Sequence, residues 1–116
     1  MKKALLQLSL LAVSAPAHAT GGLVCRTAGS RPIEVTVGFG HVAGSPLISA
    51  RLLDNGRNVP VSRAQWWLDQ SEVRLLLVDP QASQRELILR ARRSGQVYDG
   101  NLWRGGHRRW VRCREG

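Results

Sequence analysis

Tryptophan and arginine side chains crowd the C-terminal end of this chain. The stretch VYDGNLWRGGHRRWVRC, residues 97–113, carries Trp103 and Trp110 and a cluster of basic side chains around a Gly-Gly pair. An indole ring attracts cations and stacks on flat groups, and a guanidinium binds carboxylate or phosphate through two parallel hydrogen bonds. These residue types point to the binding of an anion.

A predicted hairpin decides which of these side chains share a face. Residues 96–103 and 107–114 have the pattern of two strands joined by a turn at residues 104–106. Successive side chains on a strand point to opposite faces, so the second strand separates into two sets. If Cys113 and Val111 face inward, the outward set is a basic stripe with one tryptophan in it. That set consists of Arg108, Trp110, Arg112 and Arg114.

A second aromatic site is the adjacent pair Trp66 and Trp67. In an extended segment one of the two must face outward, and the sequence leaves open which one. An outward tryptophan beside arginines is a good binding platform, whereas an inward one fills the core. The alternative is that the basic face is only the solvated outer surface of a basic protein. The candidate binding residues are Trp67, Arg104, Arg108, Trp110 and Arg112.

Catalysis has little support in this sequence. Outside the N-terminal leader the only histidines are His41 and His107, both beside glycine, and no ordered nucleophile motif accompanies them. A small hydrolase that uses His41 or His107 as base is the alternative from another functional class. Zinc ligation by these histidines with Cys25 and Cys113 lacks the close ligand spacing of known sites. We predict no enzyme activity, no cofactor and no metal.

The N-terminus has the pattern of an export signal. Lys2 and Lys3 precede a short apolar run over residues 5–13, and Ala17 and Ala19 supply the small residues of a cleavage site. The apolar run is shorter than the roughly 20 residues that span a bilayer. We predict a cleaved signal peptide over residues 1–19 and one domain over residues 20–116. The mature protein would be periplasmic or secreted, without a transmembrane anchor.

Charge limits the choice of partner. Without residues 1–19, which hold both lysines, fifteen arginines stand against eight acidic residues, and the formal net charge is +7. A basic surface outside the cytoplasm meets lipid headgroups, lipopolysaccharide phosphates, cell-wall carboxylates and acidic proteins. We therefore expect an anionic envelope component or a protein with an acidic cleft, and do not favour nucleic acid.

Cys25 and Cys113 lie near the two ends of the mature chain. In an oxidising compartment we predict a disulfide between them, since a small domain with a modest core gains from a covalent tie. Enclosing nearly the whole domain, it would contribute roughly 4–5 kcal/mol at most.

Period-two alternation between turn residues recurs along the chain and predicts an all-β fold. Asp54-Asn55-Gly56 has the composition of a hairpin turn, and Pro60 indicates a sheet edge or a bulge. The window 85–92 also fits a helix, but its inward set keeps period two, and we predict a strand. The sequence thus predicts an antiparallel barrel or sandwich of seven or eight strands, closed by a disulfide between the first and last strands.

The segment SGQVYDGNLW, residues 94–103, and the terminal cysteines resemble the small periplasmic β-barrel inhibitors of c-type lysozyme. In that family a Ser-Gly-x-x-Tyr loop enters the lysozyme cleft, and Ser94, Gly95 and Tyr98 match that motif. The resemblance implies an inhibitory loop at these residues, as an alternative to anion binding by the basic face. The chain departs from the family in its high positive charge, its Arg-rich closing strand and its shorter final segment.

Overall fold

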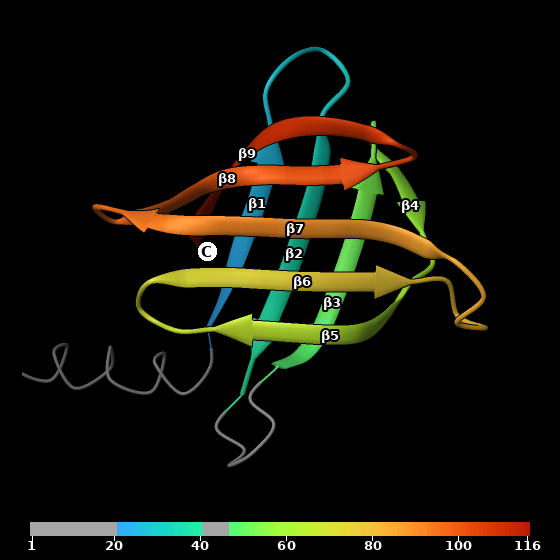
Figure 1. The fold of residues 1–116 in the computed structure, drawn as a ribbon, viewed down its shortest axis with the longest axis horizontal. Coiled ribbons are helices and arrows are strands. Elements are labelled where there is room, and N and C mark those ends of the chain that lie inside the picture. The colour runs from blue at the N-terminus through green and yellow to red at the C-terminus, as the bar shows by residue number, and fades with distance from the viewer. Residues whose placement is uncertain (1–20, 41–46) are drawn as a thin grey trace, which may run out of the picture.

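The computed structural model describes residues 21–40 and 47–116, and these residues form one antiparallel β-sheet (Figure 1). The sheet has nine strands, where the sequence predicts seven or eight. The described residues contain no helix that could span a bilayer. The strands are β1 (Gly21–Thr27), β2 (Ile33–Phe39), β3 (Leu47–Asp54), β4 (Arg57–Val59), β5 (Ser62–Leu68), β6 (Glu72–Val78), β7 (Arg85–Ser94), β8 (Val97–Arg104) and β9 (His107–Glu115).

The strand order is β4-β3-β2-β1-β9-β8-β7-β6-β5. Two meanders, β1–β4 and β5–β9, therefore join through the pairing of β1 with β9. In Figure 1 the strands β5 to β8 cross the front of the molecule, and β1 to β3 pass behind them at a steep angle. The result is a curled half-barrel with β4 and β5 at its ends. The sequence predicted that a disulfide between the first and last strands closes the sheet. These two strands instead lie at its centre, and the disulfide leaves the edges β4 and β5 open.

The predicted alternation is confirmed along β1, β2, β6 and β7. Inward side chains are buried on every second position because each strand presents one face to the space between the two layers. Fully burying one such aliphatic side chain contributes roughly 1.5–3 kcal/mol. The largest of these fully buried side chains are Leu52, Leu77, Leu87, Leu89, Leu102, Val35 and Val111.

Local signals in the sequence place the turns and settle one ambiguity. Asn55 and Gly56 have φ angles of 54° and 84°, which is the pair of positive values that the predicted two-residue hairpin requires. The window that also fitted a helix is strand β7. Pro60 directly follows the edge strand β4, where the missing N–H of proline leaves no ladder bond unmade.

The cysteines form the predicted disulfide. Cys25 on β1 and Cys113 on β9 stand directly opposite each other, are buried, and join across a sequence separation of 88 residues. Because both sulfurs are bonded to each other, neither is a zinc ligand. The predicted signal peptide and His41 lie outside the described residues.

One glycine permits a close approach of two strands in the front layer. Gly100 on β8 pairs with Ala91 on β7 and lies between two inward residues, Tyr98 and Leu102. A Cβ atom built on Gly100 would overlap the carbonyl oxygen of Arg90 and come within 2.5 Å of the Cα of Ala91. A side chain at this position is therefore incompatible with the path of β7.

Candidate functional site

The outward side chains of β5 to β9 form straight rows across the sheet. In the antiparallel registers, Trp67 stands opposite Arg74, Arg74 opposite Arg90, Arg90 opposite Asn101, and Asn101 opposite Trp110. We call these five residues the Trp–Arg row. It runs perpendicular to the strands, from the edge strand β5 to β9 near the centre of the sheet. Its two tryptophans are the exposed large hydrophobic residues of the described chain, each with 50% of its surface open to solvent.

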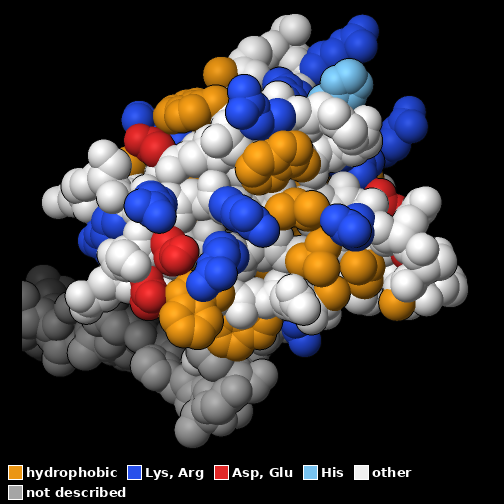
Figure 2. Space-filling model, in the orientation of Figure 1, with side chains coloured by type: hydrophobic (Ala, Val, Ile, Leu, Met, Phe, Trp, Pro, Cys, Tyr) orange, Lys and Arg blue, Asp and Glu red, His pale blue; other side chains and the backbone are white. Residues whose placement is uncertain are grey.

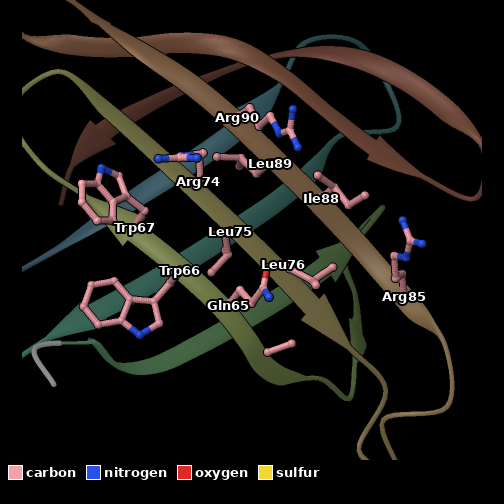
Figure 3. Close-up of a pocket in the computed structure, with 11 residues that line it drawn as sticks. Gln65, Trp66, Trp67, Arg74, Leu75, Leu76, Arg85, Ile88, Leu89 and Arg90 are labelled. Carbon is pink, nitrogen blue, oxygen red and sulfur yellow. The ribbon is translucent and has the colours of Figure 1, made fainter.

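The structure resolves which member of the tryptophan pair faces outward. Trp66 is half-buried and packs against the core, whereas Trp67 belongs to the outer face. The Trp67 indole is held on two sides: its Nε1–H donates to a carboxylate oxygen of Asp69 at 2.9 Å, and the Arg74 guanidinium lies 5.5 Å from the ring centroid. Figure 3 shows Arg74 beside this ring. Trp67 is thus a fixed platform.

Asp69 is the anchor of that platform. Its carboxylate accepts hydrogen bonds from the hydroxyl and N–H of Ser71, from the N–H of Glu72 and from Trp67. The hydroxyl of Ser71 makes the largest contribution, and together these donors hold the pKa of Asp69 well below its usual range. The carboxylate is therefore charged at any physiological pH, and Trp67 keeps its partner.

Trp110, at the other end of the row, is also held by an arginine. The Arg112 guanidinium lies 5.1 Å from the Trp110 ring centroid and binds Asp99 through two hydrogen bonds of 2.6 and 3.0 Å. These bonds lower the pKa of Asp99 and raise that of Arg112. Arg112 was predicted to bind a ligand, but its charge is already matched by a carboxylate of the same chain.

A second row of outward side chains runs beside the first. Gln65, Leu76, Ile88, Trp103 and Arg108 stand opposite one another on successive strands from β5 to β9. Its centre is apolar, and part of it joins the Trp–Arg row in lining a shallow, open hollow over β5, β6 and β7 (Figure 3). Figure 2 shows hydrophobic and arginine side chains intermixed on this face.

Three arginines on or beside the two rows keep an unmatched charge. Within the described part of the chain, no carboxylate lies within ion-pair distance of Arg85, Arg90 or Arg108. All three side chains are exposed. Arg108 could be predicted from the sequence, whereas Arg85 and Arg90 were missed, because their place in the same hollow as Trp67 depends on how β5, β6 and β7 pair.

Arg104, another predicted binding residue, is engaged in ion pairs within the protein. Its Nε donates to Asp54 at 2.7 Å and its Nη1 to Glu86 at 2.9 Å, and only 19% of the side chain is exposed. Burial alone would lower the pKa of Arg104, but the two carboxylates outweigh it and raise the pKa. Arg104 ties the β3–β4 turn to β7 and β8, and offers no open charge to a ligand.

We expect Arg104→Met to lower the free energy of unfolding by about 1–3 kcal/mol, because it leaves two partly buried carboxylates without their donor. Arg108→Met, which removes an exposed charge from the same hairpin, should change it by no more than about 0.5 kcal/mol. Urea unfolding of the two variants measures the difference. Equal midpoints would show that the Arg104 ion pairs do not stabilise the fold.

The residues that resemble the lysozyme-inhibitor loop lie in the β7–β8 hairpin. Ser94 ends β7, and Gly95 takes a positive φ of 67° in the tight turn that follows. Tyr98 is not in this turn: its side chain is 7% exposed, and its hydroxyl donates to the carbonyl of Asp69 at 2.9 Å. The tyrosine therefore points into the molecule, and the turn presents Gly95 and Gln96 instead.

The hydrolase alternative concerns His41 and His107. His107 is exposed at the start of β9, and its backbone pairs with Arg104. Within residues 21–40 and 47–116 no group of three or more histidine, cysteine or acidic side chains is placed to hold a metal ion.

Comparison with known proteins adds no family to this geometry: no family model, curated protein or solved structure matches the chain.

Proposed function

We propose that this protein is a non-catalytic binding module for an anionic partner, which it contacts through the outer face of β5 to β9. The observation that carries the proposal is the Trp–Arg row, with a half-exposed tryptophan at each end and the unmatched charge of Arg90 between them. Trp and Arg are the side chains that most often dominate binding energy at protein surfaces. Arg85 lines the same hollow and Arg108 belongs to the second row, and both extend the positive surface.

The disulfide is compatible with a periplasmic or extracellular location, and we propose that the partner belongs there. Such a partner is an anionic envelope component or a protein with an acidic cleft. Lysozyme inhibition through Ser94, Gly95 and Tyr98 is less well supported by the geometry, because Tyr98 is tethered inside the molecule.

The proposal is tested with two double variants of equal net charge. Arg90→Ser with Arg108→Ser removes two unmatched charges from the proposed face. Arg51→Ser with Arg57→Ser removes two exposed arginines from β3 and β4, in the other meander. Binding to lipopolysaccharide, phosphatidylglycerol vesicles, polygalacturonate and a c-type lysozyme is measured at low and at high salt.

We expect the Arg90/Arg108 variant to lose at least about tenfold in affinity for one of these probes, and to show a weaker salt dependence. The Arg51/Arg57 variant should retain binding within about twofold. An equal loss in both variants would mean that net charge alone drives the association, and would contradict a site on this face.

A further inference from the structure

We propose that the ligand of the outer face is a linear polysaccharide that carries carboxylates, laid across β5 to β9 along the Trp–Arg row. This inference rests on the proposed function and names the chemistry of its partner. It is carried by the shape of the row, by the charge pattern of the neighbouring row, and by the separation of the two tryptophans.

The row fits an extended ligand. Neighbouring strands lie about 4.8 Å apart, so the four intervals from Trp67 to Trp110 span roughly 19 Å. The hollow that runs along part of the row, over β5, β6 and β7, is partly open to solvent. Small molecules are held in clefts that bury most of their surface, whereas a polymer gains its affinity along its length.

A neighbouring row, displaced by two residues along each strand, shows how other arginines of the outer face are paired. On successive strands from β6 to β2 it reads Glu72, Arg92, Asp99, Arg112, Arg26 and Glu34. In this row each carboxylate faces an arginine on an adjacent strand. Asp99 forms two hydrogen bonds with Arg112, and Glu34 contacts Arg26 at 2.9 Å.

The Trp–Arg row lacks these carboxylates. Arg74 and Arg90 stand directly opposite each other, and Asn101 occupies the next position. Arg74 reaches only Glu72 of its own strand, at an exposed 3.4 Å, and Arg90 has no carboxylate partner among the described residues. In the neighbouring row the protein itself provides carboxylates for the arginines. A polymer with regularly spaced carboxylates would provide them for the Trp–Arg row.

The tryptophans favour sugar rings over nucleobases. Sites for single-stranded nucleic acid place aromatic side chains under successive bases. In the Trp–Arg row the two indoles are four strands apart, with polar side chains between them. Each indole has an arginine near its ring and half of its surface open, which suits the apolar face of one pyranose ring at each end of a short oligosaccharide.

The test uses calorimetry with galacturonate oligomers of increasing length. We expect affinity to rise until the oligomer spans the row and then to level off. Trp67→Ala and Trp110→Ala should each weaken binding by about tenfold, as for aromatic residues that anchor a ligand. Arg90→Ser should weaken it similarly, and Arg57→Ser should leave it within about twofold. Thermal unfolding of each variant confirms that it folds.

Two matched ligands separate the possible results. Methyl-esterified oligomers keep the sugar backbone but lose the charge, and we expect them not to bind. Tighter binding of an oligothymidylate of equal charge, lost in Trp67→Ala, would replace the polysaccharide by nucleic acid. If galacturonate fails while lipopolysaccharide or anionic vesicles still bind through Arg90 and Arg108, this inference is overturned and the proposed function stands. If no probe depends on these residues, both fail.

Discussion

Replacing Cys25 and Cys113 together by alanine is expected to lower the free energy of unfolding by about 2–5 kcal/mol, the usual loss for a small disulfide-bonded domain. The bond lies at a critical place in this fold. Among the described strands, β1 and β9 are the one pair that is not consecutive in sequence, and they alone connect the two meanders within the sheet. Without the bond, the unfolded chain must close a loop of nearly the whole domain before this pair can form.

Urea unfolding of the oxidised protein, the reduced protein and the double variant measures this effect. The reduced protein keeps both buried sulfur atoms, so its comparison with the double variant separates the cross-link from the space that alanine leaves in the core. Most of the loss should appear on reduction alone. An unchanged midpoint after complete reduction would show that the β1–β9 ladder holds without the bond.

Gly100→Ala is the second large effect, with an expected loss of about 3 kcal/mol or more, at the upper end of the cost of overpacking. The added methyl group meets backbone atoms of Arg90 and Ala91, which cannot move aside as a flexible side chain can. The strand β7 must therefore shift away from β8, and Arg90 of the Trp–Arg row moves with it. Binding through the outer face should weaken as well.

Gly21→Ala is the matched control, because a Cβ atom at Gly21 meets nothing within 4 Å and its φ is not positive. Thermal and urea unfolding of the two variants give the comparison. If Gly100→Ala proves as stable as Gly21→Ala, the front layer adjusts more easily than its geometry indicates, and Gly100 does not determine the path of β7.

Features set by neighbouring residues could be predicted from the sequence. The inward sets of β6 and β7, the Asn55-Gly56 turn and the disulfide all follow from alternation, turn chemistry and the number of cysteines. The place of β1 and β9 in the middle of the sheet could not be predicted, because nothing local to either strand says whether the sheet closes on them or continues past them.

For the same reason, only part of the candidate site could be predicted. Trp110 was placed on the outer face from its neighbours along the strand, and Trp67 was named as a candidate although the sequence left open whether it or Trp66 faces outward. Their membership of one row depends on four strand registers, and so does the position of Arg90 between them. The ion pairs of Arg104 were equally hidden, since Asp54 lies 50 residues away in the sequence. Alternation along a strand indicates which side chains share a face, but it does not identify the residue that each side chain meets on the neighbouring strand.

Because β1 pairs with β9, the strands follow one another across the sheet in their order along the chain, but starting from β5. The one break lies between β4 and β5, which are consecutive in sequence but do not pair in the sheet. The backbone N–H of Gly116 donates to the carbonyl of Gly22 at 3.2 Å, so residue 116 lies beside the first described strand. A circular permutant that joins residue 116 to residue 21 and opens between Pro60 and Val61 would read β5 to β9 and then β1 to β4. Every paired strand would then follow its partner directly in sequence, and the contact order would fall. Low contact order accompanies fast folding, so the same sheet would form without its one long-range step.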